Sequence, residues 1–297
     1  MEIIRIPRIV HDVASNHRRK GKSVGFVPTM GALHEGHLSL VRMARGENDI
    51  TVVSIYVNPK QFGPGEDLSK YPRDIESDAE KLKKENVDIL FIPDDALMYP
   101  EGFSTRVEVG DLSGKLCGAF RPGHFRGVAT VVTKLFNIVA PVRAYFGRKD
   151  FQQAVIIKRV ARDLDMGIDV AVCPTVREAD GLAMSSRNRY LSTEERAAAT
   201  VLYRCLSETS EAIESGIIEV QKLKSLMLER LKSEPLVSEV QYSSAYDPER
   251  LDELEQINGE ALLAIALVIG STRLIDNMLV ASTTGRHLST QAFTEAK

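Results

Sequence analysis

The sequence predicts an α/β protein, in which a doubly wound parallel sheet is followed by a second, smaller α+β domain. Three observations support this prediction. Short apolar runs rich in β-branched residues alternate with amphipathic segments up to about residue 180, a pattern typical of βαβ units and of a sheet covered on both faces. After Arg177 this alternation stops and long helical patterns begin. Glycines, histidines and a lysine cluster directly after the predicted strands, where ligands of such sheets bind.

The predicted elements of the first domain follow one another in a regular order. The strand segments are short and apolar, and they cover residues 23–29, 49–57, 87–93, 143–147 and 168–174. The helical segments have apolar residues at helical spacing, and they cover residues 37–44, 74–86, 127–140 and 151–164. The faces that we expect to be buried are formed by Ile75, Ala79 and Leu82 in one helix, and by Val128, Val131, Leu135 and Val139 in another.

The second domain is expected to consist of helices and a β-hairpin. Helical patterns run over about residues 193–215 and 217–233. Two apolar, strand-like runs follow and meet at Gly270-Ser271, a pair typical of a hairpin turn. The predicted organisation is a catalytic domain over residues 1–180, a smaller α+β lid domain over residues 181–285, and a flexible tail over residues 286–297.

The composition argues against several classes of protein. The 297 residues are 43% hydrophobic and 27% charged, as in a globular protein. A net charge of −3 argues against a nucleic-acid-binding protein, and no apolar run approaches the roughly 20 residues of a membrane-spanning helix. The N-terminal stretch lacks the basic start and unbroken apolar core of a signal peptide. The three scattered cysteines predict buried free thiols and a cytoplasmic protein.

The stretch FVPTMGALHEGHLSLV places two histidines at a strand-to-helix turn. His34 and His37 lie three residues apart, and Gly31 and Gly36 permit a tight turn and the close approach of a ligand. We expect the next helix to begin near His37, so that its free N–H groups and positive dipole end face an anion. The two imidazoles can then donate hydrogen bonds to phosphate oxygens. The alternatives are a turn residue followed by a helix cap, and a zinc site, for which no third ligand is evident.

A second cluster, YFGRKDFQQAV, also stands where a strand enters a helix. Gly147 allows the close approach of a ligand, and Lys149 offers a mobile ammonium for phosphate. Asp150 is a candidate N-cap residue. Arg148 and Gln152 are assigned to the polar cap of an ordinary helix.

A third cluster, AMSSRNRYL, lies in the loop between the two predicted domains. Met184, Ser185, Ser186 and Arg187 provide backbone and hydroxyl donors beside a guanidinium. This combination suits the β- and γ-phosphates of a nucleotide. The alternative is a solvated surface loop.

Together, HxGH after the first strand and Met-Ser-Ser-Arg late in the chain resemble the adenylate-forming superfamily of nucleotidylyltransferases and class I aminoacyl-tRNA synthetases. A more specific resemblance is to the pantothenate synthetase (pantoate–β-alanine ligase) family. It is carried, in order, by PTMGALHEGHLSL, VSIYVNPKQFGPGEDLSKYPR, RPGHFRGVATVVTKLFNIVAP, GRKDFQQ and MSSRNRYLS. The resemblance covers about residues 20–283, including the late hairpin. It implies a Rossmann-like nucleotide-binding domain.

The resemblance also implies a reaction. Pantoate and ATP would give an enzyme-bound pantoyl adenylate and pyrophosphate, and the β-alanine amine would then attack the acyl carbon to give pantothenate and AMP. ATP is thus expected as a substrate, together with Mg²⁺, and the family resemblance implies a homodimer.

Carried over by resemblance, one set of residues is expected to bind ATP. These residues are Met30, His34, His37, Gly147, Lys149, Asp150, Val176, Met184, Ser185, Ser186 and Arg187. The resemblance places His37 nearest the charge that develops on the α-phosphate, with His34, Lys149 and Arg187 as the other catalytic candidates.

A second set is expected to hold the organic substrates and the metal. Gln61 and Gln153 match the amides that bind pantoate in the family, and Asn58 and Arg121 lie in matching segments. Asp78 matches an acid associated with magnesium, and its alternative role is that of an exposed helix acid.

Two positions are expected to lie outside the chemistry. The family often has an acid where Arg148 stands, and we expect this side chain to point away from the site. His124, in the segment PGHF, is expected to lock a loop rather than line the site.

Two rival functions use the same fold. Another adenylyl-transferring nucleotidyltransferase would not need Gln61 and Gln153 as a pair. A non-catalytic nucleotide-binding protein would be expected to have lost His37, Lys149 or Arg187, and all three are present.

Overall fold

The computed structural model describes residues 1–282, which form two compact units. The first unit contains residues 1–177 and 184–186, and the second contains residues 178–183 and those from 187 onward. The predicted boundary at residue 180 therefore falls in a loop that alternates between the units. The predicted tail over residues 286–297 lies outside the described residues.

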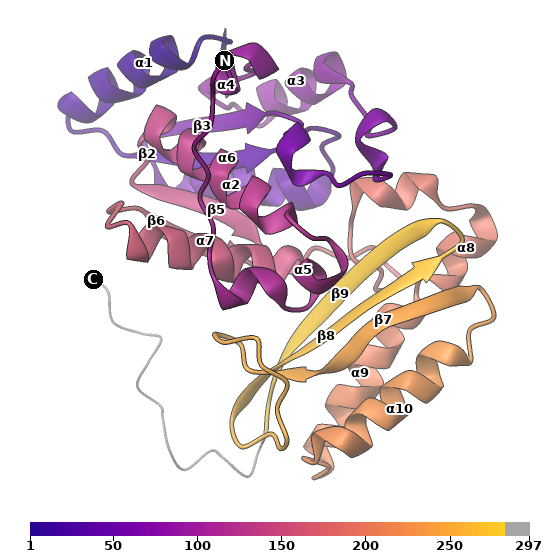
Figure 1. Cartoon of the computed structure of the whole chain (residues 1–297). Coiled ribbons are helices and arrows are strands. Elements are labelled where there is room, and N and C mark those ends of the chain that lie inside the picture. The colour runs from indigo at the N-terminus through magenta and orange to yellow at the C-terminus, as the bar shows by residue number, and fades with distance from the viewer. Residues whose placement is uncertain (283–297) are drawn as a thin grey trace. The chain divides into compact units, whose positions relative to one another are not determined.

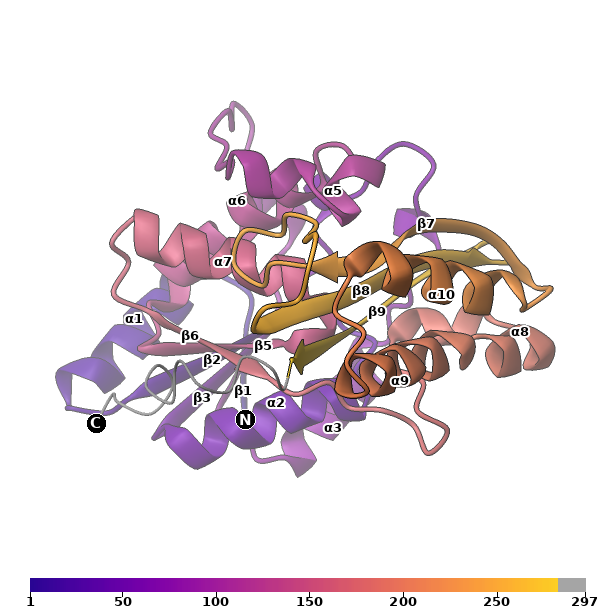
Figure 2. The same cartoon turned by 90° about the horizontal axis from the view of Figure 1, so that it is seen from below.

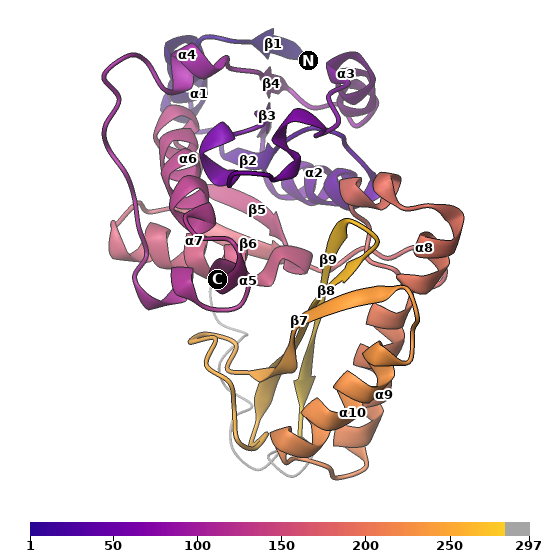
Figure 3. The ribbon, with the colours of Figure 1, turned by 45° about the vertical axis from the view of Figure 1, so that its right-hand side comes forward.

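The first unit is built on a six-stranded sheet in which every pairing is parallel. The strands are β1 (Glu2–Ile4), β2 (Val24–Thr29), β3 (Ile50–Ile55), β4 (Ile89–Phe91), β5 (Arg143–Gly147) and β6 (Asp169–Cys173). Their order is β1-β4-β3-β2-β5-β6, and the labels in Figure 3 run in this order from top to bottom. The predicted parallel sheet is confirmed. The edge strand β1 was not predicted, because its three residues are too few to show a strand pattern.

Helices cover both faces of this sheet. They are α1 (Pro7–Arg19), α2 (Glu35–Glu47), α3 (Ile75–Lys84), α4 (Asp95–Met98), α5 (Cys117–Phe120), α6 (His124–Val139) and α7 (Phe151–Asp163). Figure 3 shows α1, α6 and α7 on one side of the strands and α2 and α3 on the other. Val41 of α2 and Leu82 of α3 share a buried cluster with the sheet. On the opposite face, Phe136 of α6 packs edge to face on Phe26 of β2.

The buried helix faces agree with the predicted spacing in α6 and depart from it in α3. All four predicted apolar positions of α6 are at most 5% exposed, and they are Val128, Val131, Leu135 and Val139. In α3, Leu82 is fully buried, but Ile75 is 39% exposed and Asp78 is only 1% exposed. The prediction for Ile75 is wrong because the helix directs Asp78 and Leu82, four residues apart, toward the interior. Ile75 stands at the first helical position.

The second unit combines an antiparallel sheet with helices. Its strands are β7 (Val237–Tyr246), β8 (Glu260–Ile269) and β9 (Thr272–Ala281), and its helices are α8 (Thr193–Ala198), α9 (Val201–Glu214) and α10 (Val220–Lys232). The sheet order is β7-β8-β9, and the β8–β9 hairpin turns at Gly270-Ser271, as predicted. The first predicted helix is divided into α8 and α9. Helices α9 and α10 lie side by side against this sheet (Figures 1 and 2).

Two predictions from composition can be compared with the described residues. Cys117, Cys173 and Cys205 are all buried and free, as expected. Among residues 1–282, no helix has the combination of length and apolar character that a membrane crossing requires.

Candidate active site

The candidate site lies where the strand order of the sheet reverses. Strands β3 and β4 lie on one side of β2, and β5 and β6 lie on the other. At such a switch point the connections after two neighbouring parallel strands diverge and leave room for a ligand beyond their carboxyl ends. The histidine turn follows β2, and the segment 148–150 follows β5, which ends at Gly147. The structure therefore brings these two predicted clusters to the same edge of the sheet, on adjacent strands.

The turn after β2 is anchored to its neighbours on both sides. Gly31 has φ +82°, in the left-handed region that favours glycine, and an added Cβ would lie 3.1 Å from Asp78 Oδ2. The Thr29 hydroxyl donates to the Ser54 carbonyl at 2.7 Å and accepts from the Gly31 N–H at 3.2 Å. Asp78 Oδ1 accepts from the Leu33 N–H at 2.8 Å. These contacts hold the turn against β3 and α3.

The two histidines lie against each other at the start of α2. This helix begins at Glu35, two residues before the predicted start, so His34 is the N-cap residue and His37 the third helical residue. The ring centroids are 4.1 Å apart. Nδ1 of His37 accepts a long hydrogen bond, 3.4 Å, from the His34 N–H. Because Nδ1 is an acceptor, the neutral ring carries its proton on Nε2, and this N–H can donate to a ligand.

The surroundings of His37 favour its neutral form. Burial of the ring lowers the pKa of His37 to about 4, and the positive charges of Lys149 and Lys81 act in the same direction. The carboxylate of Asp150 opposes this shift. The same three charges show that the side chains after β5 and on α3 lie within electrostatic reach of the ring. At neutral pH, His37 is therefore an uncharged hydrogen-bond donor beside a helix N-terminus.

The residues after β3 form a rigid segment, Asn58–Gln61, which we call the Gln61 shelf. Gln61 is 8% exposed and ends the short 3-10 helix η1 (Pro59–Gln61). Its Oε1 accepts from Asn58 Nδ2 at 3.1 Å, and its Nε2 donates to Met30 Sδ at 3.1 Å. Helix α6 packs directly on the shelf, since a Cβ at Gly127 would lie 2.6 Å from the Gln61 Cα. The structure thus joins Met30, Asn58 and Gln61 in one cluster.

A second group of side chains holds the Gln61 main chain. His124 Nδ1 donates to the Gln61 carbonyl at 2.8 Å, and Arg121 donates to His124 Nε2 at 3.1 Å. Arg121 also makes two hydrogen bonds to the Glu66 carboxylate, at 2.8 and 2.6 Å. Burial disfavours the charged form of Glu66 and raises its pKa. The hydrogen bonds and charge of Arg121 outweigh this effect and keep the pKa of Glu66 below its ordinary value. His124 therefore locks a loop, as expected, and Arg121 is engaged with protein groups.

The segment after β5 faces open space. A Cβ added to Gly147 would meet no atom within 4 Å, which leaves its backbone accessible to a ligand. Lys149 Nζ lies 3.6 Å from Asp150 Oδ1, and the Lys149 side chain is 20% exposed. Asp150 occupies the N-cap position of α7, but its side chain makes no capping hydrogen bond. The Gln153 amide makes no hydrogen bond within the described part of the chain.

Gln152 has a more structural role than the polar cap that its position suggests. It is 6% exposed, and its Oε1 accepts from the Cys117 N–H at 3.0 Å. Its Nε2 donates to the carbonyls of Leu112 and Lys115 at 2.9 and 2.7 Å. Gln152 therefore fixes the loop before α5, and the assignment to an ordinary helix cap is wrong.

The Met-Ser-Ser part of the third cluster belongs to the first unit. The Met184 N–H donates to the Val176 carbonyl at 3.0 Å, which ties the loop to the segment after β6. A Cβ at Gly36 would lie 3.8 Å from the Met184 Cβ, so this loop passes close to the histidine turn. Ser186 is 8% exposed, and its hydroxyl lies 3.2 Å from the Tyr71 hydroxyl. Arg187 belongs to the second unit.

The groups around Asp78 do not form a resident magnesium site. Asp78 is buried, so the alternative of an exposed helix acid is wrong. Its Oδ1 is occupied by the Leu33 N–H and by Lys81 Nζ at 3.4 Å, whereas Mg²⁺ requires about six oxygen ligands in octahedral geometry. Among residues 1–282, no group of three His, Cys, Asp or Glu side chains is placed to hold a metal. The visible role of Asp78 is to fix the turn after β2.

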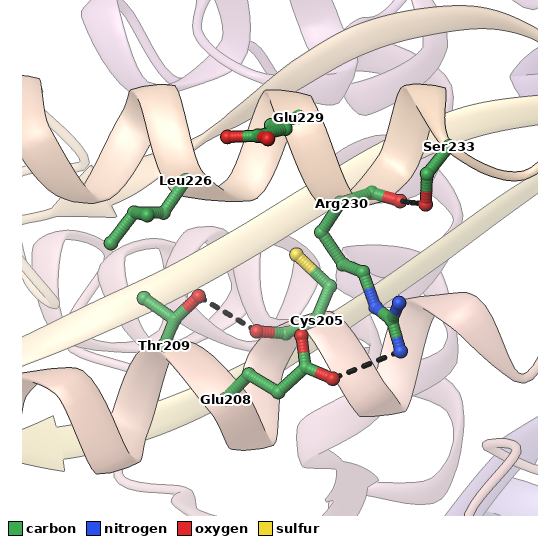
Figure 4. Close-up of a pocket in the computed structure, with 7 residues that line it drawn as sticks. All are labelled: Cys205, Glu208, Thr209, Leu226, Glu229, Arg230 and Ser233. Carbon is green, nitrogen blue, oxygen red and sulfur yellow. Dashed lines mark hydrogen bonds and ion pairs between the residues drawn. The ribbon is translucent and has the colours of Figure 1, made fainter.

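A separate pocket of about 380 Å³ lies in the second unit, between α9 and α10. Figure 4 shows Arg230 paired with Glu208, with Cys205 between the two helices. None of the predicted site residues lines this pocket. It is therefore distinct from the candidate active site.

The sequence prediction did not include several residues that shape the site. Tyr71 contacts Ser186, Glu66 holds Arg121, and Lys81 donates to the Leu33 carbonyl at 2.9 Å. Tyr99 donates to Asn58 Oδ1 at 2.8 Å. Tyr71 and Glu66 lie within the segment that carries the family resemblance, which is the only sequence signal for them. Tyr99 and Lys81 have no such signal.

The fold and the site define an α/β nucleotide-binding protein, with histidine and lysine donors at the switch point of a Rossmann-like sheet. The protein-family model described as pantoate-beta-alanine ligase matches residues 2–279. The chain therefore belongs to the pantoate–β-alanine ligase family, a family of ligases.

Individual relatives agree with this assignment. The pantothenate synthetase of Thermodesulfovibrio yellowstonii is 58% identical over 280 residues, which is 94% of this chain and 100% of the relative. The crystal structure of pantothenate synthetase from Thermus thermophilus matches with a TM-score of 0.88 at 47% identity, over 94% of this chain and 99% of that one. The pantoate-beta-alanine ligase of Francisella tularensis, in complex with Beta-gamma ATP and β-alanine, matches with a TM-score of 0.77 at 36% identity, over 94% and 97%.

Proposed function

We propose that this chain catalyses the ATP-dependent condensation of pantoate with β-alanine to pantothenate, with AMP and pyrophosphate as the other products. One observation carries the proposal: at the switch point of the sheet, the neutral His37 ring lies within electrostatic reach of Lys149. A neutral donor and an ammonium beside a helix N-terminus suit the phosphates of ATP. Family membership and the ligands of the Francisella tularensis relative support the choice of substrates.

The reaction passes through an enzyme-bound pantoyl adenylate. A carboxylate is a poor acyl donor because its leaving group would be oxide. Attack of a pantoate carboxylate oxygen on the α-phosphorus forms an O–P bond and expels pyrophosphate. The β-alanine amine then attacks the acyl carbon, AMP leaves, and the amine loses its proton. No residue of the protein becomes covalently attached.

His37 stabilises the charge that develops on the α-phosphate. Its Nε2–H donates from a ring whose Nδ1 is fixed by the His34 N–H. A nearby phosphate favours the protonated imidazole and raises its pKa, so the donor becomes stronger as charge accumulates. Loss of one such donor typically slows the chemical step by about 10²–10³-fold. His34, Lys149 and Arg187 share the phosphate charge.

The remaining nucleotide contacts follow the loops after the strands. Gly147 and Asp150 bind the ribose, and the main chain around Val176 binds the adenine. Met30 lies against the nucleotide. The phosphates are steadied by the loop residues Met184, Ser185, Ser186 and Arg187. The buried Ser186 hydroxyl beside Tyr71 supports an ordered loop at this position.

Gln61 and Gln153 bind pantoate. Neutral amides donate to the hydroxyl and carboxylate oxygens without quenching the carboxylate as a nucleophile. Asn58 and Arg121 act on Gln61 rather than on the substrate, because their polar groups are already bonded to protein partners.

Mg²⁺ reaches this site as part of the nucleotide. The phosphate oxygens of ATP supply ligands that the protein lacks around Asp78, and waters complete the shell. The substrate is accordingly the Mg²⁺ complex of ATP.

Three further properties accompany this function. The buried free thiols are in keeping with a cytoplasmic enzyme. The family implies a homodimer, which sedimentation would test. The smaller domain is proposed to act as a lid that shields the adenylate from water. Equal rates of adenylate hydrolysis with the loop 184–187, along which the chain passes from the first unit to the second, intact or replaced by glycine would contradict the lid.

Isotope exchange between pyrophosphate and ATP, with Mg²⁺ and pantoate present and β-alanine absent, tests the function directly. The expected result is exchange that requires pantoate, because only a reversible adenylate step returns labelled pyrophosphate to ATP. Folded protein that binds ATP but shows no pantoate-dependent exchange would contradict the proposal. It would leave a different adenylyl acceptor or a non-catalytic binding protein.

A further inference from the structure

The hydrogen bonds of the Asn58 side chain are fully used within the protein. Its Oδ1 accepts from the Tyr99 hydroxyl at 2.8 Å and from the Lys60 N–H at 3.2 Å. Its Nδ2 donates to Gln61 Oε1 at 3.1 Å and to the Gly127 carbonyl at 3.2 Å. A primary amide has two donors and two main acceptor directions, and Asn58 is 1% exposed. No capacity remains for a substrate, so Asn58 acts on its neighbours.

The orientation of the Asn58 amide follows from its backbone partners. The Gly127 carbonyl can only accept, so the Asn58 atom facing it is the nitrogen. The Lys60 N–H can only donate, so the atom facing it is the oxygen. The Tyr99 hydroxyl therefore donates its proton to Asn58 Oδ1, and its bond is the shortest of the four.

The orientation of Asn58 determines that of Gln61. Because the Asn58 nitrogen faces Gln61, the atom that meets it must be the Gln61 carbonyl oxygen. The Gln61 nitrogen then points the other way, toward Met30 Sδ. A thioether is a weak acceptor, so the Gln61 N–H can exchange this hydrogen bond for a stronger one to a carboxylate or hydroxyl oxygen. The shelf thus presents a donor, not an acceptor, on the side of the candidate site.

The Tyr99 ring is held by its neighbours while its hydroxyl donates to Asn58. Its ring packs edge to face on Phe103 at 5.0 Å, and Lys60 Nζ lies 5.7 Å from the ring centroid. Burial raises the pKa of Tyr99, and the charge of Asp95 raises it further. The hydroxyl therefore keeps its proton throughout the physiological pH range. A phenylalanine at this position would retain the ring contacts and lose only the donor.

We propose that Tyr99 is a positioning residue for pantoate, which holds through Asn58 the Gln61 amide whose N–H faces the substrate, an inference that rests on the function proposed above. Without the Tyr99 hydroxyl, Asn58 Oδ1 keeps only the longer bond from Lys60. The Lys60 N–H and the Gly127 carbonyl still set which way the Asn58 amide faces. Without its shortest bond, however, the amide is held less firmly, and so is the Gln61 N–H that faces the pantoate carboxylate. Binding of pantoate weakens, and binding of ATP does not.

The experiment compares wild type, Tyr99→Phe and Tyr56→Phe in the complete forward reaction. Tyr56 is the control, because its hydroxyl donates to Asp95 Oδ1 at 2.8 Å rather than to Asn58. Its ring lies beside Tyr99, with centroids 6.4 Å apart, and phenylalanine keeps this ring contact. We expect Tyr99→Phe to raise the KM for pantoate about 2- to 12-fold, the range for one lost intramolecular hydrogen bond, with kcat and the KM for ATP nearly unchanged. Tyr56→Phe should leave all three constants near wild type, and unfolding temperatures report on folding.

A double-mutant cycle with Gln61→Ala identifies the route of the effect. If Tyr99 acts through Gln61, Tyr99→Phe adds no further increase in the pantoate KM once Gln61 is absent. An unchanged pantoate KM in Tyr99→Phe would overturn the inference, and so would equal effects of the two tyrosine variants or an effect that persists without Gln61. Wild-type protein without pantoate-dependent turnover would instead overturn the proposed function, which the same assay detects separately.

Discussion

The contact between α6 and the Gln61 shelf predicts that Gly127→Ala will impair pantoate recognition. A Cβ at Gly127 would lie 2.2 Å from the Lys60 carbonyl oxygen, 2.5 Å from its carbon and 2.6 Å from the Gln61 Cα. All three are backbone atoms, so no side chain can rotate away. Carbon atoms in ordinary contact lie about 3.5–4.0 Å apart, and the shelf must therefore move by about 1 Å.

Two magnitudes follow from this displacement. Overpacking at a well-packed contact costs about 1–3 kcal/mol in the free energy of unfolding. For a chain of this size we expect a fall in the unfolding temperature of roughly 2–10 °C. A shift of about 1 Å in a substrate-positioning residue can reduce activity about 10²-fold. Activity should thus be far more sensitive than stability.

The assay is pantoate-dependent exchange between pyrophosphate and ATP, with calorimetry on the same samples. Gly46→Ala is the matched control, because Gly46 is also helical and its added methyl would meet no atom within 4 Å. That variant should keep full exchange and be slightly stabilised, since alanine is favoured over glycine in helices. Full exchange with an unchanged pantoate KM in Gly127→Ala would refute the reasoning that α6 sets the position of Gln61.

Three other predictions use single substitutions. His37→Ala should slow adenylate formation about 10²–10³-fold, and unchanged single-turnover adenylation would remove His37 from the mechanism. His37 should also make the free energy of unfolding depend on pH, because its pKa is about 4 in the folded state and about 6.5 in the unfolded chain. The unfolded state alone therefore binds this proton between these values, so wild type should lose stability relative to His37→Gln as pH falls from 6.5 toward 4. Parallel unfolding curves for the two proteins would contradict this linkage. Gly181→Ala should destabilise the second unit by about 2–4 kcal/mol. Gly181 has φ +91°, and an added Cβ would lie 1.9 Å from a Tyr203 ring carbon. Calorimetry measures the effect, and Gly259→Ala is the control because its added Cβ would meet no atom within 4 Å.

The local parts of the fold could be predicted from the sequence because they depend on nearby residues. The apolar spacing of Val128, Val131, Leu135 and Val139 matches the buried face of α6, since a helix repeats every 3.6 residues whatever surrounds it. The β8–β9 hairpin turns at Gly270-Ser271, where the turn residues indicate it. The glycines and histidines after β2 indicated the candidate site for the same reason.

The tertiary structure alone decided how side chains far apart in the sequence use their polar groups. Asp78 looks like a surface helix acid, yet it is buried because the Leu33 N–H and Lys81 satisfy it. Gln152 resembles a helix cap, but three main-chain groups of another segment engage its amide.

The sequence by itself determined the alternating elements, the family and the strand ends at which the candidate site lies. It did not determine that Asn58 is saturated, that Tyr99 supports it from 41 residues away, or that Gln61 directs its N–H toward Met30. Periodicity and turn residues report on the local chain, whereas the partner of a buried amide depends on which loops the sheet brings together. Most buried polar groups are hydrogen-bonded, but only the folded chain decides to which residue.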